Sequence, residues 1–390
     1  MNCILFDDVH TQALLPLTYT RPAAHIRCGI LTIAEKWERH MQQSFSYFTA
    51  DYLSEKYPLT TGPDNLCING RLLPNPTLIS AIKALQLNQS LEANGITLAY
   101  RSTLASATEK MEVVAFEADH QIINRVHDIF SINHSAIEAD FNLLTANRTS
   151  AEISKSNTIL GQHPIFIEEG AQVEAAVLNA KEGCIYIGKD AEIMEGALIR
   201  GPFALCEHAT VKMGAKIYTG TTIGPHCKVG GEVSNSVMFA YSNKGHDGFL
   251  GNSVIGEWCN LGADSNNSNL KNNYEMVKLW NYASQRFEKT GLQFCGLIMG
   301  DHSKCGINTM FNTGTVVGVS ANIFGSGFPR QFVPSFSWGG SQGFETYSLD
   351  KACQTADLVM QRRHLNLSAA DKQILNYIFN QDKSHRNWES

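Results

Sequence analysis

One histidine of this 390-residue chain stands in a setting that suits proton transfer. His246 follows Gly245 and precedes Asp247 and Gly248, so no bulky sequence neighbour packs against its ring. The ordinary pKa of a histidine side chain, about 6.5, suits a general base at neutral pH. We therefore treat His246 as a candidate catalytic base, with a solvated loop histidine as the alternative.

Amide and ammonium side chains follow this histidine. The stretch from 260 to 281 contains Lys271, Lys278, Asn260, Asn266, Asn267, Asn269, Asn272, Asn273 and Asn281. Asparagines are good turn formers, and most of these should form turns. Some could instead donate hydrogen bonds to a substrate carbonyl or a sugar hydroxyl. The two lysines could bind a phosphate, with solvated lysines as the alternative.

A six-residue repeat surrounds these side chains. Every sixth residue from 187 is aliphatic, and the residue four positions later is usually small: Ile187, Ile193, Ile199, Leu205, Val211, Ile217, Ile223 and Val229. The pattern returns at Phe249 and at Met299. It predicts a triangular β-solenoid with the aliphatic residues inside, rather than a β-sandwich, whose strands recur about every 8–12 residues. Breaks in the period near 230–248 and 268–291 predict segments that leave the coil, where function usually lies.

Glycine divides the chain into three regions. Only four of the 31 glycines lie in residues 1–150, and none lies after 345. Strands predicted at 3–6, 66–68, 96–100 and 112–116, with helices at 30–43 and 77–86, favour an α/β domain over 1–150. The solenoid should cover 151–345. Two helices are predicted in 346–390, the second starting with a capping box at Ser368.

Composition excludes several classes of protein. Hydrophobic residues make up 43% of the chain, and the net charge is −6 without a basic cluster, which argues against nucleic-acid binding. No apolar run approaches the roughly 18 residues of a membrane span, and the first residues do not predict a secretory signal. Ten scattered cysteines without a CxxC pair fit free thiols in the cytoplasm rather than a zinc site.

The repeats and the segment NKGHDGFLGNSVIGEWCNLGADSNNSNLKN (243–272) resemble a known family. They are similar to the acetyltransferase half of bifunctional N-acetylglucosamine-1-phosphate uridyltransferase/glucosamine-1-phosphate acetyltransferases. The resemblance implies a left-handed parallel β-helix, usually a homotrimer with sites between subunits. It implies catalysis by His246 and Asn269, and acetyl-CoA contacts at Ala263 and Asp301. Substrate would contact Asn260, Lys244 and Lys278.

Some positions depart from this family. Phe249 and Leu270 stand where tyrosines are usual, and Cys206 stands where an arginine is expected. Arg200 could substitute for that arginine. A transfer from a thioester to an amine needs a base for the amine proton and donors for the oxyanion. His246 and the asparagines could supply both.

The segments 15–22 (LPLTYTRP) and 69–74 (NGRLLP) resemble a compact bacterial form of the nucleotidyltransferase half. The glycine-rich phosphate loop of that family is missing, and Asp7 and Asp8 follow the first strand instead. We expect them to bind Mg²⁺ at the strand end, unless they cap the next turn. Arg21 and Arg71 would neutralise a nucleoside triphosphate, and Asn69 would contact substrate.

The sequence thus predicts a cytoplasmic, homotrimeric transferase. It would N-acetylate an amino-sugar 1-phosphate with acetyl-CoA and couple this step to Mg²⁺-dependent nucleotidyl transfer, giving a UDP-sugar of the UDP-N-acetylglucosamine type. One alternative is a monofunctional sugar-1-phosphate nucleotidylyltransferase with a structural β-helix. Another is a non-catalytic scaffold that binds sugar nucleotides. Neither a nucleic acid nor a membrane is expected as a partner.

Overall fold

The structure, a computed structural model, describes residues 1–105 and 111–389 and divides into two compact units. Unit 1 comprises Met1–Leu14, Thr18–Ile26 and Leu31–Arg125. Unit 2 comprises Leu15–Leu17, Arg27–Ile30 and Val126–Ser390. Residues 126–150, assigned to the first domain from sequence, group with the solenoid in this division.

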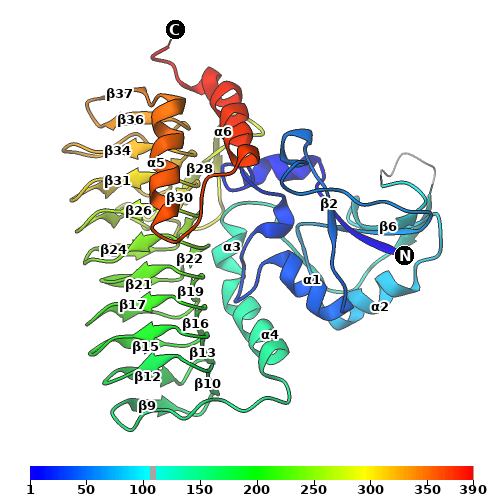
Figure 1. The fold of residues 1–390 in the computed structure, drawn as a ribbon, viewed down its shortest axis with the longest axis horizontal. Coiled ribbons are helices and arrows are strands. Elements are labelled where there is room, and N and C mark those ends of the chain that lie inside the picture. The colour runs from blue at the N-terminus through cyan, green and yellow to red at the C-terminus, as the bar shows by residue number, and fades with distance from the viewer. Residues whose placement is uncertain (106–110, 390) are drawn as a thin grey trace. The chain divides into compact units, whose positions relative to one another are not determined.

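Unit 1 is built on a mixed six-stranded sheet in the order β2-β1-β3-β6-β5-β7 (Figure 1). Its strands are β1 (Asn2–Phe6), β2 (Ser46–Phe48), β3 (Asn65–Asn69), β5 (Gln89–Ala93), β6 (Ile96–Ser102) and β7 (Glu112–Ala115). β1 runs parallel to β2 and β3, whereas β6 is antiparallel to β3 and β5. A small antiparallel pair joins β4 (Leu72–Leu73) to β8 (Gln121–Ile122).

The predicted strands and helices of unit 1 are confirmed. Helix α1 (Ile33–Met41) begins at a capping box formed by Thr32 and Glu35, and α2 (Pro76–Ala84) begins at Asn75, whose side chain accepts from the amide of Leu78. These caps bond amide groups that a first helical turn leaves unpaired. Short 3₁₀ helices cover Val9–Leu14, Ala23–His25, Asp51–Leu53 and, in unit 2, Asp382–His385.

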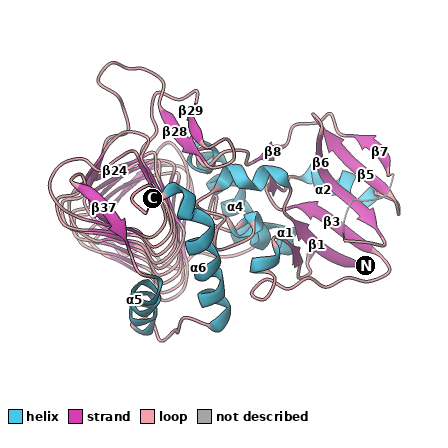
Figure 2. Cartoon of the chain, turned by 90° about the horizontal axis from the view of Figure 1, so that it is seen from above, coloured by secondary structure: helices cyan, strands magenta, loops and turns pink. Residues whose placement is uncertain are grey.

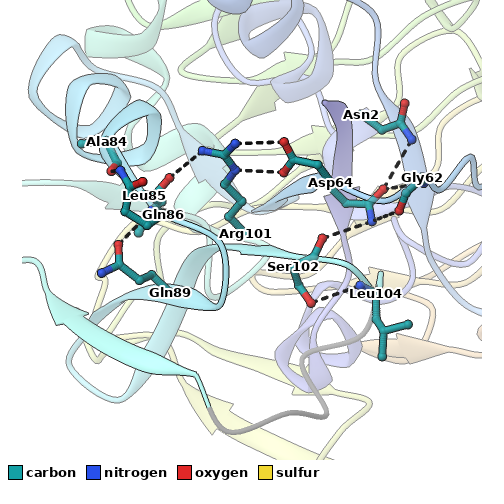
Figure 3. A network of polar contacts seen from close by, with 11 residues as sticks. Asn2, Gly62, Asp64, Ala84, Leu85, Gln86, Gln89, Arg101, Ser102 and Leu104 are labelled. Carbon is teal, nitrogen blue, oxygen red and sulfur yellow. Dashed lines mark hydrogen bonds and ion pairs between the residues drawn. The ribbon is translucent and has the colours of Figure 1, made fainter.

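Polar contacts hold β3, β6 and the preceding loop together (Figure 3). Arg101 on β6 donates from Nε and Nη2 to the Asp64 carboxylate, both at 2.9 Å, and from Nη1 to the Leu85 carbonyl at 3.0 Å. Buried Asn65 donates to the carbonyls of Gly62 and Ser102 and accepts from the amide of Gly62. This part of the sheet is therefore fixed by side chains as well as by the strand ladder.

Unit 2 is a parallel β-solenoid with three faces, stacked in Figure 1 and seen end-on in Figure 2. Face 1 consists of β9 (Thr158–Gly161), β12 (Val177–Ala180), β15 (Leu198–Arg200), β18 (Lys216–Ile217), β21 (Glu232–Ser234) and β24 (Phe249–Gly251). The chain then forms β27 (Asn266–Asn267), which pairs with β32 (Met310–Phe311).

Face 2 consists of β10 (Ile165–Ile167), β13 (Ile185–Ile187), β16 (Phe203–Leu205), β19 (Thr221–Ile223), β22 (Val237–Met238), β25 (Val254–Ile255), β30 (Ile298–Met299), β33 (Val316–Val317) and β35 (Phe332–Val333). Face 3 consists of β11 (Gln172–Val173), β14 (Glu192–Ile193), β17 (Thr210–Val211), β20 (Lys228–Val229), β23 (Asn243–Lys244), β26 (Asn260–Leu261), β31 (Lys304–Cys305), β34 (Asn322–Ile323), β36 (Ser337–Gly340) and β37 (Gly343–Thr346).

The repeat in the sequence is the interior of this solenoid. All eight aliphatic residues from Ile187 to Val229 lie in its core and are at most 2% exposed. The returning series from Met299 to Ile323 is also buried there. One predicted position is wrong: Leu250, not Phe249, points inward, because Val233 pairs with Leu250 in the neighbouring strand.

The two breaks in the period have different structures. Residues 268–291 leave the coil as predicted, and they include the hairpin of β28 (Lys278–Asn281) and β29 (Arg286–Lys289), which projects from the coils in Figure 2. The segment 230–248 instead stays in the coil as β21, β22 and β23. Paired residues on face 3 are eighteen apart from Val211 to Val229 but only fifteen apart from Val229 to Lys244.

This short coil places a lysine in the interior column of face 3. Lys244 pairs with Val229, is 1% exposed, and donates from Nζ to the carbonyls of Gly230 (3.0 Å) and His246 (2.9 Å). Burial lowers the pKa of Lys244 to about 8, although the carboxylates of Asp247 and Asp264 oppose the shift. The ammonium group therefore tethers the backbone at His246 from inside the solenoid.

Face 2 carries a helical layer. Helix α3 (Asp128–Ser131) leads into α4 (Asn133–Thr145), and buried Asn133 donates to the Gly220 carbonyl at 2.8 Å. Asn133 also accepts from the amide of Gly29 at 2.7 Å. Gly29 has φ +83°, and a Cβ there would lie 2.4 Å from Asp140 Oδ2, so only glycine fits. The segment 27–30 is thus locked into unit 2.

The two predicted C-terminal helices are confirmed as α5 (Leu349–Gln361) and α6 (Ala369–Gln381). Helix α6 begins with the expected capping box of Ser368 and Asp371, and its Phe379 packs edge-on against Phe336 of the solenoid. Figure 1 shows both helices beside the last coils. Across the described residues we find no helix with the length and apolarity to cross a membrane.

Replacing Lys244 by methionine should change how stability depends on pH. Between pH about 8 and about 10.5, the unfolded chain binds a proton that folded Lys244 has lost, so the free energy of unfolding should rise with pH by about 3 kcal/mol. Lys244→Met removes this rise. Urea unfolding at pH 7.5 and pH 10 measures it.

The matched control is Lys216→Met, at an exposed position on β18. Its stability should change with pH as the wild type does. Parallel curves for wild type and Lys244→Met would contradict the assignment of a buried ammonium group.

Candidate functional site

A groove of about 800 Å³ runs across face 3 of the solenoid. Its floor is formed by the outward residues of β20, β23, β26 and β31, and one wall is formed by the end of α5. The lining residues are Lys212, Lys228, Tyr241, Asn243, Gly245, His246, Trp258, Cys259, Asn260, Leu261, Gly262, Ala263, Lys304, Ile307, Val359, Arg362 and Arg363.

The groove is strongly cationic. Five of its lining residues are lysine or arginine, and none of the described lining residues is acidic. Burial, together with the charges of Arg363, Lys212 and Arg362, lowers the pKa of Lys228. Burial also lowers the pKa of Lys304. Cations held this close together favour a ligand with several negative charges, such as a polyphosphate.

Helix α5 brings two of these cations. Arg362 is its C-cap residue, and Arg363 donates from Nη2 to the carbonyl of His226 at 3.2 Å. Cations at the C-terminus of a helix also interact favourably with its dipole. Helix α5 thus completes the groove that the strands of face 3 begin.

His246 lines the groove at the corner between faces 3 and 1. Its side chain is exposed, and its backbone carbonyl accepts the bond from Lys244. Asn260 is exposed beside it on face 3, in register with Asn243 on one side and Lys304 on the other. Asn243 Oδ1 is buried and has no hydrogen-bond partner in the described part of the chain. An exposed imidazole therefore faces a site with amide groups.

The other predicted residues of unit 2 are spread more widely. Ala263 lines the groove, whereas Asn269, Lys278 and Asp301 are not among its lining residues. Asn269 lies at the corner between faces 1 and 2 and donates from Nδ2 to Asn252 Oδ1 at 2.8 Å. Lys278 is exposed on β28, and buried Asp301 accepts from the amide of Glu257 at 2.8 Å. Their roles stay predictions.

Positions that depart from the family do not add an arginine to the groove. Arg200 is exposed on face 1, with Nη1 3.5 Å from Glu182 Oε1. Cys206 is buried on face 2 and contacts the carbonyl of Ile30. The amide of half-buried Phe249 donates to Asn266 Oδ1 at 2.8 Å. The anion-binding groups come instead from face 3 and α5.

The five cations of the groove were not singled out from the sequence. They are Lys212, Lys228, Lys304, Arg362 and Arg363. The repeat contained a signal for the first three, because each lies next to an inward aliphatic or cysteine position and so must point outward on face 3. No local pattern could bring the arginines of α5 to the same place.

In unit 1, the predicted residues Asp8, Asn69 and Arg71 form one network. Fully buried Arg71 donates from Nε and Nη2 to the two oxygens of Asp8, at 3.0 and 2.6 Å. Asn69 donates from Nδ2 to Asp8 Oδ2 at 2.9 Å. Although burial raises the pKa of Asp8, the bonds and charge of Arg71 lower it overall. Asp8 is therefore the half-buried partner of a fully buried arginine.

Asp7 lies in a separate set of bonds. It accepts from the amide of Ala23 at 2.9 Å and from the hydroxyl of Thr49 at 2.5 Å. Burial raises the pKa of Asp7 to about 6. Arg21, two residues before Ala23, is buried, and its Nη2 lies 3.4 Å from Thr20 Oγ1. Both predicted metal ligands are therefore already bound to protein donors.

These carboxylates do not present an open divalent-cation site. Among residues 1–105 and 111–389, no three histidine, cysteine or acidic side chains are grouped to hold a metal ion. The arrangement fits an internal ion pair and a turn bond, so we derive no step through Mg²⁺. The role of Asp7 and Asp8 as metal ligands stays a prediction.

Residues 3–149 match the family described as sugar nucleotidyl transferase. The match covers unit 1 together with α3 and α4, and it supports the resemblance found in segments 15–22 and 69–74.

Curated relatives match parts of the chain at low identity. The bifunctional protein GlmU of Methanocaldococcus jannaschii is 37% identical over 87 residues, 22% of this chain and 21% of that protein. A bifunctional sugar-1-phosphate nucleotidylyltransferase/acetyltransferase of Sulfurisphaera tokodaii is 25% identical over 264 residues, 67% of this chain and 58% of that protein. The chain thus spans about a fifth of the length of the first relative and under three fifths of the length of the second.

Solved structures share less. The UDP-N-acetylglucosamine acyltransferase of Arabidopsis is 14% identical, with coverage of 55% of this chain and 80% of that chain and a TM-score of 0.25. The enzyme of the same name from Campylobacter jejuni is 15% identical, with coverage of 58% and 95% and a TM-score of 0.22. Solved structures with identities and TM-scores this low give no evidence about the function of this chain.

Single changes at the two aspartates should differ in their effect on the free energy of unfolding. Asp8→Asn leaves the Arg71 guanidinium buried without its counter-ion and should lower the free energy of unfolding by about 3–5 kcal/mol. Asp7→Asn should cost less than about 1 kcal/mol or stabilise at pH 7, because it removes a carboxylate that burial disfavours. Chemical unfolding at pH 7 distinguishes the two.

The pH dependence provides the control. Folded Asp7 holds its proton up to pH about 6 and the unfolded chain only to about 3.8, so wild-type stability falls relative to Asp7→Asn as pH rises through this window. Equal losses for the two variants at pH 7 would contradict this account.

Proposed function

We propose that the chain is a cytoplasmic two-step transferase. The solenoid transfers an acetyl group from acetyl-CoA to the amine of an amino-sugar 1-phosphate, and unit 1 transfers a nucleotidyl group to the sugar phosphate, giving a UDP-sugar of the UDP-N-acetylglucosamine type. The observation that carries the acetyl step is the acid-free cationic groove with His246 at its edge. The family of residues 3–149 carries the nucleotidyl step.

The groove suits a CoA thioester. CoA is long, thin and rich in phosphate, and the groove offers a floor of strands with cations at one side and along its length. Lys228, Arg362 and Arg363 would bind its phosphates. The thioester would then lie toward His246 and Ala263, at the opposite edge of face 3 from Tyr241 and Trp258. Names of the relatives include both acetyltransferase and nucleotidylyltransferase, which agrees with this division.

The acetyl step follows from this placement. The amine nitrogen attacks the thioester carbonyl carbon, the carbon–sulfur bond breaks, and His246 accepts the amine proton. That proton passes to the leaving thiolate, so the products are the N-acetyl sugar and CoA. The Asn260 and Asn243 amides, which line the groove, would donate to the oxyanion or to sugar hydroxyls. A serine nucleophile is not needed for direct transfer.

A homotrimer would complete the site. Face 1 exposes Leu160, Leu198 and Tyr218, at 37%, 47% and 41% exposure, which is apolar surface that a second copy can cover. His246 and Asn269 lie at the two opposite corners of face 1. Packing of copies along this face would bring Asn269 of one copy toward His246 of another.

The nucleotidyl step would join UTP to the sugar 1-phosphate with release of pyrophosphate. The sequence predicts substrate contacts for Arg21, Asn69 and Arg71. All three side chains are buried, and Arg71 is paired with Asp8, so these contacts stay predictions. Magnesium is expected to accompany the nucleoside triphosphate, as for phosphoryl transfer in general.

Two sets of substitutions separate the roles in the groove. With acetyl-CoA and a panel of amino-sugar phosphates, His246→Ala should lower kcat by about 10²–10⁴-fold with KM for acetyl-CoA little changed. The double change Arg362→Ala, Arg363→Ala should instead raise that KM by about tenfold or more, because charge-assisted phosphate bonds are lost. Thiol release measures both, and pyrophosphate release from UTP or dTTP measures the nucleotidyl step.

The controls are exposed residues of the same types outside the groove. His163→Ala and Arg330→Ala should leave both constants within twofold of wild type. His246→Ala activity within threefold of wild type would remove His246 from the mechanism. Pyrophosphate release without thiol release from any sugar would favour the nucleotidylyltransferase with a structural β-helix.

A further inference from the structure

A column of stacked aromatic rings runs along the corner between faces 2 and 3. Neighbouring ring centroids lie 4.8, 4.8, 4.1 and 6.5 Å apart, and their planes differ by at most 18°. The members, one from each successive coil, are His208, His226, Tyr241, Trp258 and His302. Each has φ between 54° and 60°, so the corner repeats one left-handed turn that aims each side chain the same way. Tyr241 and Trp258 also line the groove.

The column stops where the next coil supplies a serine. The Ser320 amide donates to the carbonyl of Asp301, just as the His302 amide donates to that of Glu257, so Ser320 is the next position of the column. Its φ of 54° agrees. Ser320 is 2% exposed, and its Oγ has no hydrogen-bond partner among the described residues. A ring is missing at this level, and a buried hydroxyl is left unused.

A pocket of about 170 Å³ lies at this interrupted position. One water needs only about 10–15 Å³ of such volume, so the space can hold a group of several atoms. It is lined by His302, Lys304, Ser320, Ala321, Asn322, Trp338, Tyr347, Ala352, Thr355 and Ala356. The two alanines of α5 are small side chains that leave this space open. Lys304 lines both the pocket and the cationic groove, so the two cavities share a wall.

We propose that this pocket binds the adenine ring of the CoA donor, which takes the place of the missing ring next to His302. This inference rests on the proposed function. A flat heteroaromatic ring suits a stacked column whose next member is absent, because aromatic faces stack favourably on one another. The hydroxyl of Ser320 and the amide of Asn322 offer hydrogen bonds to ring nitrogens. The adjoining cations would then bind the phosphates that a nucleotide carries next to its base.

Filling the missing position tests the proposal. Ser320→Phe supplies the absent ring, and the corner accepts aromatics at this φ, as Tyr241 and Trp258 show. Ala356→Leu fills the pocket independently from α5. Each should weaken binding of CoA and of adenosine 3′,5′-bisphosphate by about tenfold or more, the scale of one base stacked on an aromatic side chain. Isothermal titration calorimetry on the full chain measures both ligands.

An acetyl donor that lacks the nucleotide distinguishes a loss of adenine binding from a general loss of activity. With S-acetylpantetheine, which lacks the adenine nucleotide, both variants should keep a KM within twofold of wild type. Ser320→Ala removes one hydrogen bond to the ring but leaves the pocket open, so it should weaken CoA binding less than either filler does. Thermal melting confirms that the variants are folded. Because Ser320→Phe and Ala356→Leu fill the pocket from different elements, the same result in both is not explained by one local packing defect.

Three results would overturn the inference. These are unchanged CoA binding in both fillers, equal losses with acetyl-CoA and S-acetylpantetheine, or acetyl transfer by a wild-type chain that does not bind adenosine 3′,5′-bisphosphate. In the last case the proposed function would stand. Conversely, nucleotide binding that both fillers weaken, in a chain that transfers no acetyl group, would support the pocket while contradicting the acetyl step.

Discussion

The inward-facing side chains of the solenoid are the constraint on which the site depends. Each coil must place one apolar residue per face inside, because the interior is a continuous close-packed column. Once these positions are fixed, the neighbouring residues on every strand must point outward. Lys228, Asn243, Asn260 and Lys304 are aligned on face 3 for this reason, since each precedes an inward residue in paired strands. Packing in the core therefore sets the chemistry on the surface.

The same constraint explains the exceptional coil. In the short coil between Val229 and Lys244 a lysine turns inward, and its ammonium group donates to the carbonyls of Gly230 and His246. Burying an amine in this way is unfavourable unless it is hydrogen-bonded. Its bond to the backbone of His246 ties this short coil to the candidate base. The buried lysine in the core thus fixes the backbone of the loop that carries the candidate base.

Much of this architecture could be predicted from the sequence, because the solenoid repeats a local rule. The hexad period identified the buried residues from Ile187 to Val229, and capping signals identified the start of α6. The period predicts Phe249 as the inward residue, which is wrong, because a fixed six-residue spacing fails across a coil that is shorter than the regular ones. Likewise, the strand-end position predicts Asp7 and Asp8 as metal ligands, and no local pattern indicates their bonds to Thr49 and Arg71, which are distant in sequence. Arg362 and Arg363 reach the groove through the docking of α5, which no local pattern encodes.

The central claim is that the cationic groove on face 3 is the site of the acyl donor. The most direct measurement is a crystal structure of the full chain with CoA bound. We predict the phosphates of CoA against Lys228, Arg362 and Arg363, and its sulfur at the edge of the groove beside His246. CoA bound away from face 3, or on face 3 with its sulfur remote from His246, would contradict the account.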